Sequence, residues 1–250
     1  MPEIRPFLGP GVEVVEAGVL DNLTEEEIAG LAPGPGDSVL VSRLRDGREV
    51  KLRHQDVVDR MQGVLDLVAP GAEAVLLLCT GSFPRLEASC PILYPEHILS
   101  NVARAVLAGY DRAHVGVLTP GEEQVNEQRE RWTQVLGASG LTVLPVSPYH
   151  DVEPQTRAGH GAGVAERPGM EYTTIPDPVA RRMAVAGRQL REAGVQIAIM
   201  DCLGYTAGMK QALREAFGGP VLLARTVLAR VAGELLSADG CQGHAGVTFR

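Results

Sequence analysis

Two short stretches of the sequence decide the fold: AVLLLCTG at residues 74–81 and IAIMDCLG at residues 197–204. Each is an apolar run too short for a helix, and such runs are typical of strands buried in a parallel sheet. Each ends in a cysteine that is followed two positions later by a glycine. Another glycine, Gly71 or Gly194, lies eight residues before each cysteine and closes a predicted helix. The repetition predicts two similar lobes, each with a thiol at the end of a strand.

Strand and helix patterns alternate along most of the remaining chain, which predicts an α/β fold with mostly parallel sheets covered by helices. Further strands are expected at residues 12–19, 38–44, 48–52, 114–118, 141–146 and 220–224. Helices are expected at residues 2–8, 55–68, 95–107, 122–136, 178–193, 206–217 and 227–236. One more helix begins at a capping box, in which Thr24 and Glu27 satisfy free backbone amides.

Two segments break this alternation. Residues 150–176 are rich in glycine, proline, histidine and charge and have no hydrophobic period, so we expect a long loop there. Such a loop is either a lid over a site or a passive insertion. Residues 237–250 are expected to form a flexible tail.

Composition excludes several classes of function. The net charge is −8 and no basic run occurs, which argues against nucleic acid or an anionic membrane as partner. No stretch approaches eighteen apolar residues and the start lacks a signal-peptide pattern, so we expect no membrane span and a cytoplasmic location. The 4 cysteines have neither a CxxC pair nor zinc spacing, so we expect neither a structural metal nor disulfides.

Two thiols at strand ends suggest a specific chemistry, because ligands of open α/β sheets bind at the carboxyl ends of strands. If Cys79 and Cys202 face each other across a substrate carbon, one removes a proton and the other returns it from the opposite face. That is racemisation or epimerisation without a cofactor. The reaction requires a group that stabilises the substrate carboxylate while the carbon loses its proton.

Backbone amides and hydroxyls just after each cysteine are the candidates for holding that carboxylate. Glycine lets the backbone approach a ligand closely, and a helix start presents free amides. The candidate residues are Thr80, Gly81 and Ser82 after the first cysteine, and Gly204, Tyr205 and Thr206 after the second.

Other readings of these residues remain open. A cysteine at the end of an apolar strand is often a small core residue, although the matched pair favours a site. Asp201 either tunes Cys202 or is a satisfied buried carboxylate. Tyr149 ends a predicted strand and is a further candidate for the site, whereas Cys90 and Cys241 lie in no such context.

Several motifs resemble the AroM family, which is similar to the aspartate/glutamate/hydantoin racemase superfamily. They are LLCTG at 77–81 followed by Phe83-Pro84, SPY at 147–149, DCLGY at 201–205 and PVLLA at 220–224. The resemblance covers about residues 2–236 and implies two pseudo-symmetric α/β lobes with the active site in the cleft between them.

The resemblance also implies which residues form each lobe and which carry the chemistry. Lobe A would comprise residues 1–105 plus 222–236, with the last helix crossing back to complete it, and lobe B residues 106–221. Cys79 and Cys202 match the two catalytic thiols of the superfamily, and a homodimer is expected. The family also opens with a strand, central in lobe A, that is absent before Pro2, so we expect the chain start to be misplaced or trimmed.

Together these observations predict a cofactor-independent racemase or epimerase of a small carboxylate or amino-acid-like compound. Two alternatives remain. The same fold could carry out decarboxylation or cis-trans isomerisation with one thiol, or the protein could bind a metabolite without catalysis.

Overall fold

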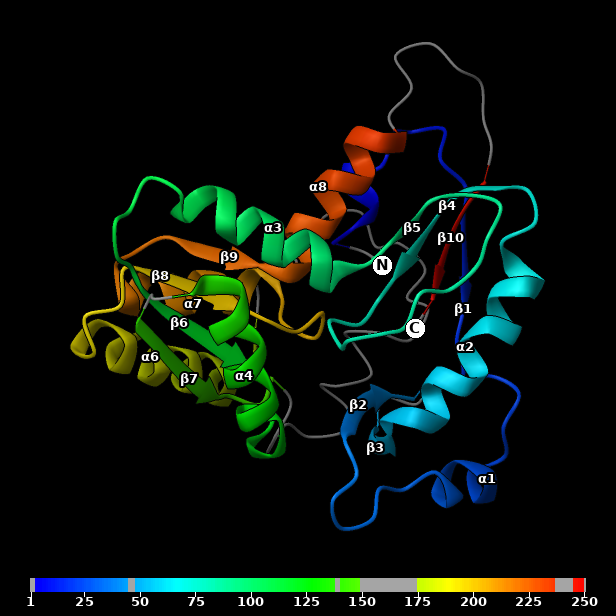
Figure 1. Ribbon diagram of the computed structural model, residues 1–250, viewed down its shortest axis with the longest axis horizontal. Coiled ribbons are helices and arrows are strands. Elements are labelled where there is room, and N and C mark those ends of the chain that lie inside the picture. The colour runs from blue at the N-terminus through cyan, green and yellow to red at the C-terminus, as the bar shows by residue number, and fades with distance from the viewer. Residues whose placement is uncertain (1–2, 45–47, 138–139, 149–174, 237–244, 250) are drawn as a thin grey trace. The chain divides into compact units, whose positions relative to one another are not determined.

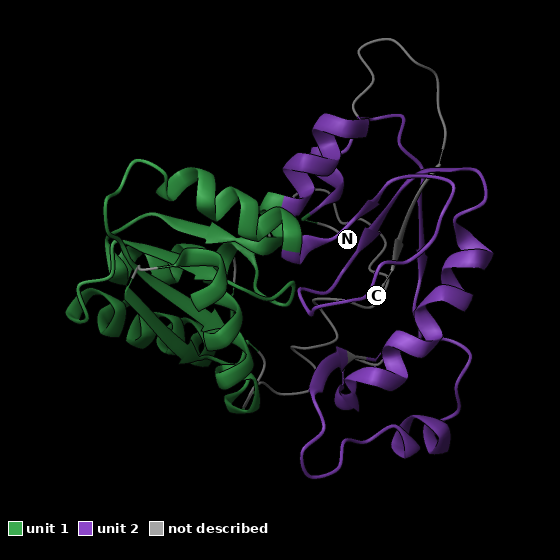
Figure 2. Ribbon diagram, viewed as in Figure 1, with its two compact units in different colours: residues 1–3, 97–227 green, residues 4–96, 228–250 purple. Residues whose placement is uncertain are grey.

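The computed structural model describes residues 3–44, 48–137, 140–148, 175–236 and 245–249 (Figure 1). The chain forms two compact units (Figure 2). Unit 1 comprises Met1–Glu3 and His97–Val227, and unit 2 comprises Ile4–Glu96 and Leu228–Arg250. The loop expected at 150–176 lies outside the described residues up to residue 174, as does Tyr149. No helix in the described part of the chain is long and apolar enough to cross a membrane.

Unit 1 is built on a fully parallel sheet of four strands in the order β7-β6-β8-β9. The strands are β6 (His114–Thr119), β7 (Gly140–Pro145), β8 (Ile197–Met200) and β9 (Val221–Leu223). All residues of β8 are buried, as the continuous apolar run predicts for a central parallel strand. The cysteine strand at 197–204 is therefore confirmed, although the strand itself ends at Met200.

The described helices of unit 1 are α4 (Val125–Leu136), α6 (Asp177–Glu192) and α7 (Ala207–Phe217), with a 3₁₀ turn, η2 (Glu122–Gln124), before α4. Helices α6 and α7 pack at close range at Gly187, where an added Cβ would lie 2.6 Å from the carbonyl oxygen of Leu213. Among the described residues, Trp132 of α4 and Tyr205 are the largest fully buried side chains. The sequence predicts α4 as a polar helix, and its buried face is narrow, formed by Gln128 and Trp132.

Unit 2 contains a parallel sheet in the order β1-β10-β4-β5 and an antiparallel pair, β2-β3. The strands are β1 (Val14–Ala17), β2 (Val39–Arg43), β3 (Glu49–Arg53), β4 (Ala72–Leu77), β5 (Ile92–Leu93) and β10 (Ala245–Phe249). Its helices are α1 (Glu25–Gly30) and α2 (His54–Val68), with a short 3₁₀ turn, η1 (Arg5–Phe7). Helices α3 (Pro95–Leu107) and α8 (Ala224–Leu236) each contain a boundary between the two units.

Residues 245–249 form strand β10, so the flexible tail expected at 237–250 is wrong for these residues. It lies between β1 and β4 and pairs with both in parallel, so the last strand of the chain occupies a central position in the sheet (Figure 1). The resemblance predicts that this sheet lacks a central strand. In the structure, the backbone groups of β1 and β4 that face this position are paired with β10.

Most of the helix starts and helix ends predicted from the sequence are confirmed. The capping box at Thr24 is present, because Thr24 Oγ1 accepts from Glu27 N and Glu27 Oε2 accepts from Thr24 N. Gly71 and Gly194 have φ values of 83° and 70°, as the closing of helices before the two cysteine strands requires. The helix expected at 2–8 is wrong: among the described residues there, only the single turn η1 forms, and the chain becomes extended at Leu8, with φ −84° and ψ 144°.

Candidate functional site

The two cysteine strands end in the same local structure. Each cysteine lies two residues beyond the last residue of its strand, Leu77 of β4 or Met200 of β8. Cys79 Sγ accepts a hydrogen bond from Gly81 N at 3.4 Å, and Cys202 Sγ accepts one from Gly204 N at 3.2 Å. The repeat seen in the sequence is therefore a repeat of backbone geometry. An amide that donates to sulfur favours the thiolate form.

The surroundings of Cys79 belong to unit 2. Cys79 is half-buried and packs against an apolar cluster that includes Leu40 and Phe83. Gly81 has little room for a side chain, because an added Cβ would lie 3.1 Å from Leu40 Cδ2 and 3.5 Å from Cys79 Sγ. Thr80 is buried and Ser82 is exposed. This half of the predicted site thus contains a thiol, a glycine and two hydroxyl side chains on one turn.

His54 is a neighbour of this turn that sequence reasoning treats as a lone histidine. Its ring stacks on Phe83 with the centroids 5.5 Å apart. Its Nε2 is buried and meets no hydrogen-bond partner among the residues that the structure describes. The only sequence signal for its position is that it begins α2 directly after β3.

The surroundings of Cys202 belong to unit 1. Tyr205 is fully buried, and its hydroxyl donates to the carbonyl oxygen of Val146 at 2.8 Å. Burial raises the pKa of Tyr205 well above its usual value, and the charges of Cys202 and Asp201 raise it further. Thr206 is the N-cap of α7, and its Oγ1 accepts from Met209 N at 3.3 Å. The side chains of Tyr205 and Thr206 therefore hold this loop in place.

Asp201, for which two readings are open in the sequence, points its carboxylate at α4. Oδ2 accepts hydrogen bonds from the guanidinium of Arg131 and, at 2.7 Å, from Nε1 of Trp132. The residue is only 1 % exposed, and its amide donates to Leu118 O at 3.0 Å. Sequence reasoning missed Arg131 and Trp132, because nothing in a charged helix surface signals which arginine turns inward.

A second ion pair, between Glu3 and Arg225, also stabilises the loop after Cys202. Nη1 of Arg225 donates to Glu3 Oε2 at 3.0 Å, and Nε of Arg225 donates to Leu203 O at 2.8 Å. The two carboxylate oxygens of Glu3 accept from Ala207 N, the first residue of α7, at 3.2 and 3.3 Å. A carboxylate of the chain itself thus occupies the helix start that the sequence suggests for a ligand carboxylate. Neither Glu3 nor Arg225 is signalled by the sequence.

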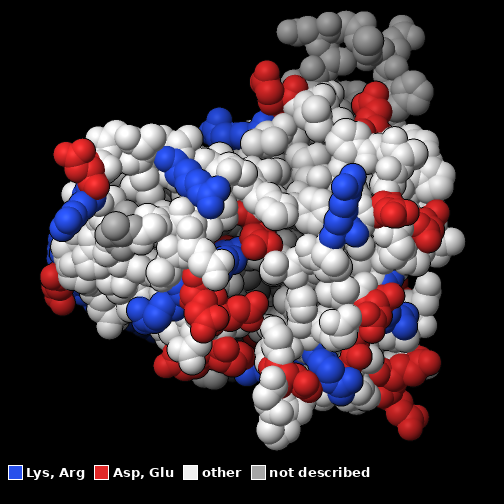
Figure 3. Space-filling model, viewed as in Figure 1, with Lys and Arg blue, Asp and Glu red and all other residues white. Residues whose placement is uncertain are grey.

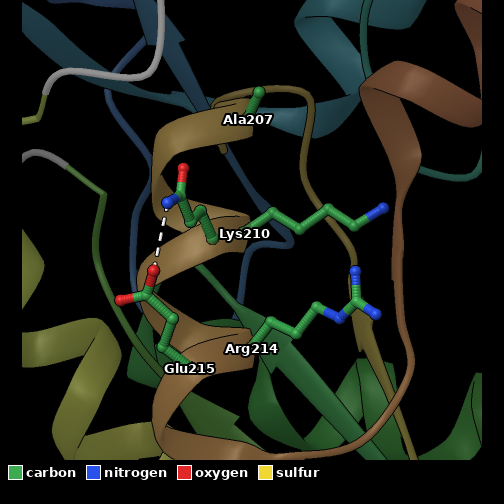
Figure 4. Close-up of a pocket in the computed structure, with 5 residues that line it drawn as sticks. Ala207, Lys210, Arg214 and Glu215 are labelled. Carbon is green, nitrogen blue, oxygen red and sulfur yellow. Dashed lines mark hydrogen bonds between the residues drawn. The ribbon is translucent and has the colours of Figure 1, made fainter.

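A hollow of about 560 Å³ lies along α7, lined by Ala207, Lys210, Gln211, Arg214 and Glu215. Lys210 and Arg214 extend to the same side of the helix, while Gln211 and Glu215 are joined by a hydrogen bond of 3.0 Å (Figure 4). None of these lining residues belongs to the predicted site. Elsewhere, acidic and basic side chains are interspersed on the face of the molecule in view (Figure 3).

The described residues contain no group of three or more His, Cys, Asp or Glu side chains that could hold a metal ion. Cys90 is half-buried, and burial raises the pKa of its thiol. Cys241 lies outside the described residues. The structure thus brings together Cys79, Thr80, Gly81 and Ser82 within unit 2, and Asp201, Cys202, Gly204, Tyr205 and Thr206 within unit 1.

Comparison with known proteins gives a family. No curated protein matches the chain. Among solved structures, the chain is similar to allantoin racemase from Pseudomonas fluorescens, with 15% identity, 90% of each chain covered and a TM-score of 0.48. It is also similar to glutamate racemase isoform RacE1 from Bacillus anthracis, with 14% identity, a TM-score of 0.47 and coverage of 95% of this chain and 86% of that one. The model of the family described as AroM protein matches residues 1–236, so the chain belongs to the AroM family.

Proposed function

We propose that this protein is a cofactor-independent racemase or epimerase of a small carboxylate or amino-acid-like compound. Cys79 and Cys202 act as the acid/base pair on opposite faces of one substrate carbon. In each direction one thiolate takes the α-proton, and the other thiol donates a proton to the opposite face. The net reaction moves no electrons out of the substrate and needs no co-reactant.

The observation that carries the proposal is the repeated turn at the ends of β4 and β8. In each, a half-buried thiol accepts a hydrogen bond from the amide two residues ahead. A base must be ionised to take a proton, and this hydrogen bond favours the ionised form of either sulfur. Two thiols in the same backbone geometry suit a reaction that is nearly symmetric in its two directions.

The carboxylate of the substrate is proposed to bind at the turns that follow the two thiols. Thr80 and Ser82 supply hydroxyls on one side and Thr206 does so on the other, since the amides of Gly81 and Gly204 donate to the two sulfurs. Tyr205 supports this turn instead, since its hydroxyl donates to Val146 O in the core and its amide donates to Cys202 O at 3.3 Å. Delocalised charge on the carboxylate is then stabilised as the α-proton leaves.

Proton exchange in deuterium oxide tests this function. Amino acids, hydantoins and hydroxy acids are incubated with the wild type and with the Cys79→Ala, Cys202→Ala and Cys90→Ala variants. We expect α-deuterium in both enantiomers with the wild type and with Cys90→Ala, and loss of racemisation by at least about 100-fold in the other two. No incorporation with any candidate substrate contradicts the proposal, and binding without exchange indicates a metabolite-binding protein.

A one-thiol decarboxylase or cis-trans isomerase is the second candidate. The ion pair of Asp201 favours it, because this pair precedes Cys202 whereas the matching position before Cys79 is Leu78. This function predicts a product of altered mass or geometry and activity that survives Cys79→Ala.

A further inference from the structure

The peptide group between Leu203 and Gly204 makes hydrogen bonds at both of its ends. Its N–H, on Gly204, donates to Cys202 Sγ at 3.2 Å. Its carbonyl, on Leu203, accepts from Nε of Arg225 at 2.8 Å and also from Nη2 of the same guanidinium. A peptide group is planar, so the direction of the carbonyl fixes the direction of the N–H. One planar group therefore connects the side chain of Arg225 to the sulfur of Cys202.

The guanidinium of Arg225 is itself held in place. Arg225 is the second residue of α8, and its Nη1 donates to Glu3 Oε2 at 3.0 Å. The same carboxylate accepts from Ala207 N at the start of α7. The side chain of Arg225 is 20% exposed and that of Glu3 is 8% exposed. The arginine thus makes two hydrogen bonds to Leu203 O and an ion pair with Glu3, a fixed fork of donors that lysine cannot reproduce.

Hydrogen bonds at a carbonyl act on the N–H of the same peptide group in two ways. They restrict rotation of the group, so the N–H keeps its direction toward the sulfur. They also polarise the group and make the N–H a stronger donor, and here they come from a charged guanidinium. A stronger donor to Cys202 Sγ favours the thiolate over the thiol. Arg225 can thus act on this sulfur through one shared peptide group.

Other charged groups belong to the surroundings of the same loop. Asp201 precedes Cys202 and pairs with Arg131 of α4. Burial raises the pKa of Tyr205, and the charges of Cys202 and Asp201 raise it further. These groups are present in the wild type and in every variant of Arg225, so a difference between those variants reports the change at Arg225.

We propose that Arg225 is a positioning residue for Cys202: its guanidinium holds the carbonyl of Leu203 and thereby directs the Gly204 N–H at the sulfur. The consequence for catalysis rests on the proposed function, because it assumes that Cys202 exchanges a proton with a substrate. The effect on the thiol itself does not depend on that assumption.

The rate of alkylation of Cys202 by iodoacetamide, followed by peptide mass spectrometry between about pH 5 and 10, tests the proposal. Only the thiolate reacts, so the midpoint of the rate curve reports the ionisation of the thiol. Arg225→Met removes the donors to Leu203 O, and the midpoint should rise by about 1 pH unit. Arg225→Lys keeps the positive charge but loses the paired donors, so the midpoint should rise by at least about half as much. Arg188→Met removes an exposed arginine of α6 and should leave the midpoint unchanged.

The amide NMR spectrum of protein made with isotope-labelled glycine gives a second readout. In Arg225→Met and Arg225→Lys the amide proton resonance of Gly204 should move upfield, because its N–H becomes a weaker donor. Gly81, whose N–H donates to Cys79 Sγ at 3.4 Å, is the matched control in unit 2 and should not move. The Cys202→Ser and Cys79→Ser variants identify the two resonances.

A raised Cys202 midpoint in both Arg225 variants, with the Gly204 resonance shifted and that of Gly81 unchanged, supports the positioning role. If Arg225→Lys matches the wild type in both readouts, only the positive charge matters and the proposal is overturned. An unchanged Gly204 resonance in Arg225→Met also overturns it. Equal midpoint shifts at Cys79 and Cys202 overturn it as well, because a general loss of packing affects both thiols.

The catalytic consequence is measured separately, with a substrate found by deuterium exchange. At neutral pH, Arg225→Lys should lower kcat by about threefold or more while KM stays within about twofold of the wild type. Alkylation and NMR use no substrate. If both behave as expected while deuterium exchange is absent, the proposed function fails and the positioning role of Arg225 stands.

Discussion

The sequence places Tyr205 among the residues expected to hold a substrate carboxylate, and the structure buries its side chain in the core of unit 1. The hydroxyl satisfies the carbonyl of Val146, 59 residues away along the chain. At the scale of single residues, the types and spacing around the two cysteines could be read from the sequence. The partners of Tyr205 and Asp201 could not, because they come from other elements and depend on the tertiary fold.

Replacing Tyr205 by Phe tests its structural role. The variant leaves Val146 O without its buried donor, so the free energy of unfolding should fall by about 1–3 kcal/mol. Urea denaturation measures this change. If the side chain has no contact with substrate, KM should stay within about twofold of the wild type. A large rise in KM with unchanged stability would place the hydroxyl at the ligand instead.

The pH dependence of stability provides a second test of Tyr205. Its folded pKa is raised because burial disfavours the charged phenolate, with Cys202 and Asp201 adding to the effect. The raised pKa contributes stability that is complete below the unfolded value of about 10 and is lost as pH rises beyond it. The wild type should therefore lose stability above about pH 10 more steeply than Tyr205→Phe. Parallel curves would contradict this.

At the scale of helices and strands, hydrophobic periodicity and the residues at helix ends were sufficient to predict most of the elements. The apolar runs of β4, β6 and β8 and the helix pattern of α2 predict elements that the structure confirms. Strands β5 and β10 were missed. Ile92–Leu93 is too short for a pattern, and Ala245–Phe249 pairs with strands that are distant in the sequence. The last helix begins at Ala224 rather than at residue 227, directly after β9.

The start of α7 depends on Glu3. Its carboxylate accepts from Ala207 N and pairs with Arg225, and its side chain is 8% exposed. Glu3→Gln removes the charge at the helix start and should lower the free energy of unfolding by about 1–2 kcal/mol. Chemical denaturation measures the loss. Glu192→Gln, an exposed residue of α6, is the matched control and should change stability by less than about 0.5 kcal/mol. Equal effects would contradict a special role for Glu3.

At the scale of the whole molecule, the sequence repeat predicts two lobes, and the structure contains two units that each carry a parallel sheet of four strands. Each unit contributes one thiol turn. Pattern reasoning found this repeat because a buried parallel strand leaves a continuous apolar run. It did not find that the sheet of unit 2 is completed by the last strand of the chain.

Removing β10 should affect the two units differently. A chain ending at Leu236 leaves the facing edges of β1 and β4 without their partner. Amide hydrogen exchange followed by mass spectrometry should then show faster exchange in β1 and β4, while β6 and β8 keep their protection. Unchanged protection of β1 and β4 would mean that β10 does not stabilise this sheet.

The distance between the sulfurs of Cys79 and Cys202 in a crystal structure with a bound substrate analogue tests the central claim most directly. An acid/base pair acting on one carbon predicts a separation of about 7–8 Å, with the ligand carbon between the two sulfurs. Sulfurs that face separate cavities, or that lie more than about 12 Å apart with the analogue bound, would contradict the two-thiol mechanism.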